Sequence, residues 1–157
     1  MFQSSSRTFR SAVVIGAALL FSAPFAAAHM GAKGIVRERM EMMKSIAHEM
    51  KTVAAMVRGK TAFDGTRIEA SAKRVAAHGT RIVAMFPKGS GGGVSEAANE
   101  IWTDPDGFRR AADDMIDAAN RLRVAAQSGE ANAVKGAFGD LGKSCGGCHR
   151  DYRVKKN

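Results

Sequence analysis

Five consecutive residues near the C-terminus, Cys145-Gly146-Gly147-Cys148-His149, form a C-x-x-C-H motif. Two thiols at this spacing can add to the two vinyl groups of a porphyrin, and the adjacent imidazole can coordinate the iron, so the motif is typical of haem c attachment. Other interpretations of a C-x-x-C pair fit less well. A thioredoxin-like pair belongs in a βαβ context that the sequence lacks, a zinc site needs a further ligand, and a disulfide across two residues of a helix is strained.

The first 28 residues have the pattern of a secretory signal peptide. Arg7 and Arg10 supply a positive region, residues 11–21 an apolar one, and residues 26–28 (AAA) a cleavage site. The apolar stretch is short against the roughly 20 residues that span a bilayer, so a membrane anchor is the weaker alternative and no stable membrane insertion is expected. Export predicts a periplasmic location for residues 29–157, in an oxidising compartment where haem is attached covalently.

Composition excludes several classes of protein. Two Cys and three Pro among 157 residues, 25% of them charged, exclude a disulfide-dense mini-protein and a Pro-rich disordered chain. The net charge of +9 falls to +7 without the first 28 residues, which contain two Arg and no acid. The cations are scattered and not interleaved with aromatic residues that could stack on bases, so no nucleic-acid partner is expected. An acidic redox partner protein, attracted by this charge, is expected instead.

The elements that position the motif are predicted to be helices, because apolar residues recur at steps of three and four and no stretch alternates for long enough to be a strand. Four long segments are predicted: one ending at Gly59, one over about 67–86, one from Asp104-Pro105 to Gly129, and one over about 131–155. A Gly-rich loop over 88–95 and a short helical turn over 96–102 separate the second from the third. We therefore expect an all-α fold, an antiparallel up-down four-helix bundle, in residues 29–157.

Each segment has one apolar stripe that is expected to face the interior. On the first segment the stripe is Val36, Met40, Met43, Ala47, Met50, Ala54 and Val57. On the second, Gly79 stands at a stripe position, where it favours close approach of a neighbouring helix. On the fourth, Cys145 and Cys148 belong to the stripe. Only six aromatic residues remain in 29–157, so we expect a haem to fill part of the core.

The chain resembles class II c-type cytochromes, the cytochrome c′ and cytochrome c-556 family, over the whole of residues 29–157. The resemblance rests on five stretches: residues 145–153 (CGGCHRDYR), 139–143 (GDLGK), 100–102 (EIW), 85–89 (MFPKG) and 58–64 (RGKTAFD). It implies a four-helix bundle with one covalent haem c near one end. The thioethers would come from Cys145 and Cys148, with His149 as an axial ligand to the iron.

The second axial ligand distinguishes the subtypes of this family. The resemblance places Met43 over the distal face of the haem, where a Met coordinates iron in low-spin c-556 members and where cytochrome c′ members leave an open site. The residues around Met43 look closer to the c-556 type. Met40, one turn earlier on the same stripe, and Met42 are the alternatives. Two arginines, Arg39 and Arg153, resemble haem-pocket residues of the family.

These observations predict a periplasmic haem c electron-transfer protein with His/Met axial ligation. The alternative is a high-spin cytochrome c′ whose open distal site binds NO or CO. The sequence contains no catalytic triad, no acid–base carboxylate pair and no phosphate loop, so we do not expect an enzyme. Many members of the family are homodimers through their first two helices, and the resemblance extends this option to the chain.

Overall fold

The structure, a computed structural model, describes residues 31–154, so the predicted signal peptide and its cleavage site lie outside the described residues. The elements are α1 (Gly34–Val57), α2 (Gly65–Ile82), the 3-10 turn η2 (Val83–Met85), α3 (Glu100–Thr103), α4 (Pro105–Ser128) and α5 (Ala131–Tyr152). The part of the chain that is described contains no strand, only an isolated bridge between Ala97 and Arg153. None of its helices is both long enough and apolar enough to cross a membrane.

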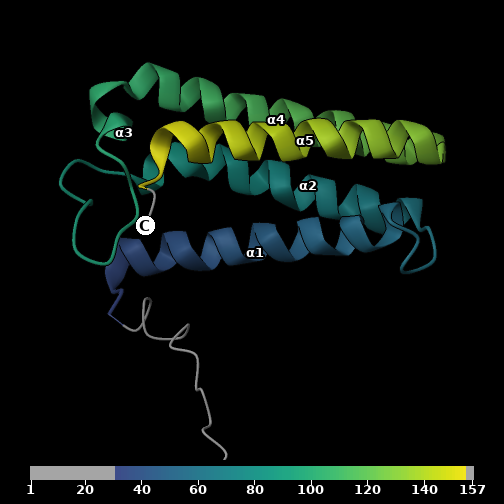
Figure 1. The fold of residues 1–157 in the computed structure, drawn as a ribbon, viewed down its shortest axis with the longest axis horizontal. Coiled ribbons are helices and arrows are strands. Elements are labelled where there is room, and N and C mark those ends of the chain that lie inside the picture. The colour runs from purple at the N-terminus through teal and green to yellow at the C-terminus, as the bar shows by residue number, and fades with distance from the viewer. Residues whose placement is uncertain (1–30, 155–157) are drawn as a thin grey trace, which may run out of the picture.

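The four long helices run up and down in chain order, which confirms the predicted antiparallel bundle (Figure 1). The start of α1, the loop before α3 and the last turn of α5 lie at one end of the bundle. The α2 and α4 helices pack closely along their length, and Gly79 permits this, because a Cβ there would stand 2.5 Å from Ile116 Cγ1. The close approach predicted at Gly79 is therefore confirmed.

Local signals in the sequence explain where α4 begins and ends. Asp104 is its N-cap residue and accepts a hydrogen bond from the Gly107 amide at 3.0 Å, with Pro105 at the first position. Gly129 ends the helix with a φ of +74°, which favours glycine. Both boundaries agree with the prediction. A second N-cap residue, Asp64 before α2, accepts from the Arg67 amide at 2.9 Å and was not predicted.

The face of α1 that packs against α2 is not the predicted stripe. The buried residues of α1 are Arg39, Met42, Ile46, Glu49 and Val53, each one position before a member of that stripe. One position corresponds to a rotation of about 100° around the helix axis. The prediction was wrong because two of the buried positions are charged. The apolar residues of the predicted stripe are instead half-buried or exposed.

Glu49 is buried because it has three hydrogen-bond donors on α2. Its Oε1 accepts from Arg74 Nε at 2.6 Å, and its Oε2 accepts from Arg74 Nη2 at 2.8 Å and from Ser71 Oγ at 2.7 Å. Chiefly because of the hydrogen bonds from Arg74, the pKa of Glu49 is lowered to about 2. This bidentate, charge-assisted contact fixes the rotation of α1 against α2.

The low pKa of Glu49 makes its stabilisation depend on pH. Its folded-state pKa lies below the ordinary value of 4.5, so its contribution is complete above about pH 4.5 and is lost as the pH falls towards 2. We expect Glu49→Gln to lower the free energy of unfolding of the haem-loaded protein by about 2 kcal/mol at pH 7, and by much less at pH 3. Urea unfolding followed by far-ultraviolet circular dichroism at both pH values measures this.

Glu41→Gln is the matched control, because Glu41 lies on the same helix and pairs with Lys44 at the surface. We expect no resolvable change in its unfolding free energy. An equal loss for Glu49→Gln at pH 7 and at pH 3 would contradict the assignment of the effect to the buried carboxylate.

Candidate functional site

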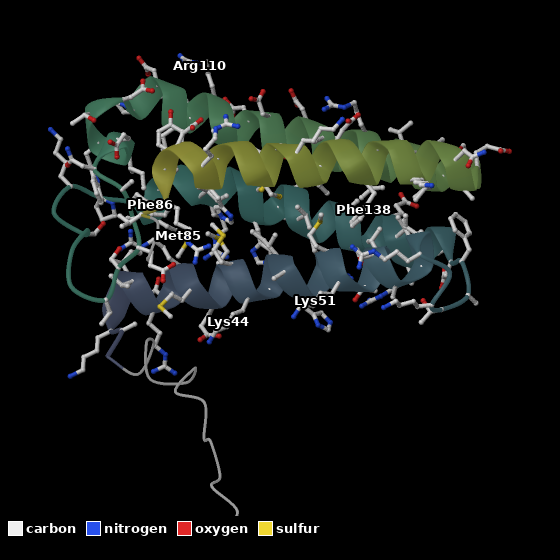
Figure 2. All side chains as sticks on the ribbon, viewed as in Figure 1. Lys44, Lys51, Met85, Phe86, Arg110 and Phe138 are labelled. Atoms are coloured by element: carbon white, nitrogen blue, oxygen red, sulfur yellow. The ribbon has the colours of Figure 1, made fainter. Side chains whose placement is uncertain are left out.

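A cavity of about 400 Å³ lies between α1, α5 and the segment that joins η2 to α3. The α1 wall contains Met40 and Met43, and the α5 wall contains Cys148 and His149. Phe86 borders the same cavity and lies at the end of the bundle where the loop meets the last turn of α5 (Figure 2). The first part of the predicted α1 stripe, from Val36 to Ala47, thus faces a cavity rather than another helix.

The cavity brings together most of the residues that the sequence singled out. Met43, His149, Cys148, Arg39 and Arg153 all border it. Cys145, one turn before His149 on α5, is half-buried against the hydrophobic core beside it. Of the two alternative methionines, Met40 borders the cavity, whereas Met42 is 6% exposed and packs into the core.

The two cysteines lie in the last two turns of α5, near the carbonyl end of the helix. Burial raises the pKa of both thiols, and that of Cys148 reaches about 11 with a further contribution from the neighbouring Cys145. Redox-active C-x-x-C pairs require a lowered thiol pKa, which the amino end of a helix supplies and the carbonyl end opposes. Within residues 31–154 no group of three or more His, Cys, Asp or Glu could hold a metal ion. The raised thiol pKa values disfavour the redox-active dithiol alternative.

The two candidate iron ligands come from opposite walls of the cavity. His149 follows Cys148 directly, and partial desolvation together with the positive charge of Arg153 lowers the pKa of its imidazole. A neutral ring has a free nitrogen lone pair, as an iron ligand requires. Met43 is half-buried, packs against the core and presents a soft thioether to the same space.

Arg39 is a buried cation in the wall of the cavity. It is 5% exposed, its guanidinium stacks on Phe86 with 4.4 Å from Cζ to the ring centroid, and Nη2 donates to the Ser90 carbonyl oxygen. Its Nη1 is buried and has no hydrogen-bond partner. A buried cationic donor without a partner is costly, so this corner of the cavity fits an anionic group such as a carboxylate.

Arg153, the second predicted haem-pocket arginine, already has a protein partner. Its guanidinium donates to Glu96 Oε2, with Nε at 2.8 Å, and its backbone bridges to Ala97. The Val154 amide also donates to the Glu96 carbonyl oxygen at 2.9 Å. These contacts tie the end of α5 to the segment over 94–97 that closes one end of the cavity.

Trp102 holds the Gly-rich loop in place beside the cavity. Its indole Nε1 donates to the carbonyl oxygens of Phe86 at 3.0 Å and Pro87 at 3.1 Å. The six-membered part of its ring lies so close to Gly91 that a Cβ there would stand 2.8 Å from it. The sequence predicted this loop over residues 88–95. It did not predict that the loop would contact Trp102 and Arg39.

A second junction joins the last turn of α5 to the start of α4. Tyr152 Oη donates to Asp104 Oδ2 at 2.9 Å, and Asp104 is also the N-cap residue of α4. The Tyr152 ring packs edge-on against Phe108, and Phe108 packs against Phe86 in the same way. A Cβ on Gly107 would collide with both Asp104 and Tyr152. The sequence reasoning recognised the cap but not this junction.

Known proteins are similar to this chain in sequence and in fold. The family model described as Cytochrome C' matches residues 34–153. A cytochrome c-556 from Agrobacterium fabrum is 36% identical, over 90% of this chain and 95% of that protein. The solved structure of a cytochrome c prime from Shewanella frigidimarina is 35% identical, covers 77% of this chain and 94% of its own, and has a TM-score of 0.71. The nitric oxide complex of a mutant cytochrome c prime from Alcaligenes xylosoxidans is 30% identical, with coverages of 78% and 94% and a TM-score of 0.71.

A helical bundle with a C-x-x-C-H motif at the wall of an apolar cavity defines a c-type cytochrome, a protein with one covalently attached haem c. The chain belongs to the cytochrome c′ family, whose members include proteins named cytochrome c′ and cytochrome c-556. The residues present fit this cofactor. The cavity has apolar walls for a porphyrin, and the unpartnered Nη1 of Arg39 suits one of its carboxylates.

The junction between α4 and α5 generates a stability prediction. Gly107→Ala forces a Cβ into Asp104 and Tyr152, so we expect it to lower the free energy of unfolding by about 1–3 kcal/mol. Gly136→Ala on α5 is the matched control, because nothing lies within 4 Å of a Cβ there. Adding a Cβ at this exposed helical position should stabilise the protein by about 0.5–1 kcal/mol. Urea unfolding compares the two, and equal effects would rule out the steric explanation.

Proposed function

We propose that this protein is a periplasmic electron carrier in which Cys145 and Cys148 attach the haem and His149 and Met43 are the axial ligands to its iron. One observation supports this most directly: His149 and Met43 border the same cavity from opposite walls. When bound, the haem supplies an iron that accepts and releases one electron. We propose no enzymatic reaction, in keeping with the family of haem cytochromes to which the chain belongs.

The four candidate residues would have separate roles in this proposal. Cys145 and Cys148 would hold the haem through thioethers and so tie it to α5. His149 would bind the iron through a neutral ring nitrogen and Met43 through its thioether sulfur, a ligand that raises the reduction potential relative to a second imidazole. If both residues bind, water and small ligands would be kept from the iron.

The two arginines act at the edge of the site. Arg39 would offer its unpartnered Nη1 to a haem propionate, while Phe86 and Ser90 hold its guanidinium in place. Arg153 is committed to Glu96, so its role is to hold the last turn of α5 against the closing segment. Residues 1–28 act as a signal peptide in this proposal, and acidic redox proteins are the partners.

A second candidate function is a high-spin cytochrome c′ with an open distal site that binds NO or CO. Its support is that relatives named cytochrome c′ match the chain, and that one solved relative is described as a nitric oxide complex. Met43 is half-buried and does not fill the cavity, so the choice depends on whether its sulfur binds the iron.

The visible absorption spectrum tests the ligation. We expect a low-spin spectrum in both redox states and no CO binding at neutral pH. Met43→Ala should convert the protein to a high-spin form that binds CO, because the axial sulfur is lost. Met40→Ala is the control, since Met40 borders the same cavity one turn away and should leave the spectrum unchanged. A wild-type protein that is high-spin and binds CO would support the second candidate instead.

The reduction potential tests the role of Arg39. Removing a buried cation beside the haem stabilises the more positive Fe(III) state, so Arg39→Gln should lower the potential by about 60 mV, the value of a tenfold change for one electron. Spectroelectrochemical titration measures the shift. Arg37→Gln on the exposed face of the same helix should change the potential far less. Equal shifts for both variants would show that Arg39 acts only through net charge.

A further inference from the structure

Four cations follow one another along the outer face of α1. Arg37, Lys44, Lys51 and Arg58 are spaced by seven residues each, and all are exposed. Seven residues are two turns of helix with a drift of about 20°, so the four side chains lie within about 60° of one another. The row is about 32 Å long at 1.5 Å per residue. Figure 2 shows Lys44 and Lys51 on the side of α1 that faces away from the other helices.

This cationic row, defined by Arg37, Lys44, Lys51 and Arg58, is weakly neutralised. Lys44 pairs with Glu41, with 2.9 Å from Nζ to Oε1. Glu41 also attracts Arg37 electrostatically, whereas Lys51 and Arg58 form no ion pair within the described residues. The row also reaches the functional site, because Lys44 borders the cavity that contains Met43 and His149.

The charge of residues 33–154 is divided unevenly between two halves. Residues 33–88, which form α1, α2 and η2, contain 12 Lys and Arg and 5 Asp and Glu, a net charge of +7. Residues 89–154, which form α3, α4 and α5, contain 8 and 10, a net charge of −2. The positive field is therefore directed outward from the α1 and α2 side, and the cationic row is its outermost line.

On α5, the surface next to His149 offers little steric obstruction to a protein that approaches the cavity. Gly142 is seven residues before His149 and so lies on the same side of α5, and Gly146 is within one turn of His149. Both are exposed, and nothing lies within 4 Å of a Cβ built on either. A partner that contacts α1 can therefore approach the cavity without meeting a side chain at these positions.

We propose that the cationic row on α1 is the docking surface for an acidic redox protein. This inference rests on the proposed electron-transfer function and adds the face at which the electron crosses. Complementary charge raises the rate of encounter and orients the partner so that its own redox centre comes close to the cavity.

Two other occupants fit the surface less well. Helices that bind anionic membranes place large apolar side chains beside their cations. In residues 31–154 the exposed large hydrophobic residues, among them Phe63 and Val124, lie outside the row. A second copy of the chain would place two cationic rows against each other, and like charges repel. An acidic protein has neither difficulty.

The test is the rate at which the reduced, haem-loaded protein passes one electron to plastocyanin, an acidic blue-copper protein, in stopped flow. Iron goes from Fe(II) to Fe(III) as copper goes from Cu(II) to Cu(I). At about 10 mM salt we expect Lys51→Glu/Arg58→Glu to slow the bimolecular step about tenfold. At about 200 mM salt the difference should largely disappear, since salt screens the row.

The matched control is Arg109→Glu/Arg121→Glu, which changes the net charge equally on the exposed surface of α4. We expect a less than twofold change. Equal slowing by both double variants, or slowing by neither, overturns the proposal. A reversible one-electron wave of the wild-type protein in spectroelectrochemistry separates this outcome from a failure of electron transfer itself.

Two further measurements distinguish the occupants. If the row variant loses binding to phosphatidylglycerol vesicles but reacts with plastocyanin at the wild-type rate, the row is a membrane contact and the proposal is wrong. If sedimentation velocity shows a dimer that the row variant dissociates, again with an unchanged rate, the row is a contact between copies and the proposal is also wrong.

Discussion

The contact of Glu49 with Arg74 and Ser71 determines which face of α1 borders the cavity. Three hydrogen bonds to a carboxylate that is 6% exposed hold α1 at one rotation against α2. A rotation by one residue would bury Met43 and Ala47 against α2 and turn Glu49 to solvent. Such a face would bury more apolar surface, yet it would take Met43 away from the wall of the cavity beside α5. A buried ion pair that selects one packing over another is a known use of such pairs.

The closed end of the cavity depends on contacts between segments far apart in sequence. Arg39 of α1 donates to Ser90, Trp102 of α3 donates to Phe86 and Pro87, and Arg153 after α5 donates to Glu96. The Tyr152–Asp104 hydrogen bond adds α4 to the same end. Each contact contributes modestly by itself, but together they place the last turn of α5, with Cys148 and His149, against a rigid support. The candidate ligand on α5 is thus positioned by the whole end of the bundle.

Much of this molecule could be predicted from its sequence because its strongest signals are local. The C-x-x-C-H spacing, the Asp104-Pro105 start and the Gly129 stop each depend on a few neighbouring residues, and the periodicity predicts the number of helices. The rotation of α1 could not be predicted, because hydropathy treats Arg39 and Glu49 as surface residues and their partners, Ser90 and Arg74, are 51 and 25 positions away. The Tyr152–Asp104 junction is hidden for the same reason, with a separation of 48 residues. The sequence therefore singled out the stripe that contains Met40 and Met43, which border the cavity. It wrongly predicted that this stripe packs against another helix.

The position of the C-x-x-C-H motif in α5 imposes an order of assembly. A ribosome makes α1 first and the two cysteines about a hundred residues later, so the α1 wall of the cavity exists long before the wall that faces it. Met40, Met43 and Ala47 face the cavity rather than a neighbouring helix, so their burial on that side depends on the cofactor. An apolar surface left open during biogenesis promotes aggregation, and the cell must therefore complete haem attachment quickly or shield the chain until it does. We therefore expect haem supply to limit how much of the folded protein accumulates.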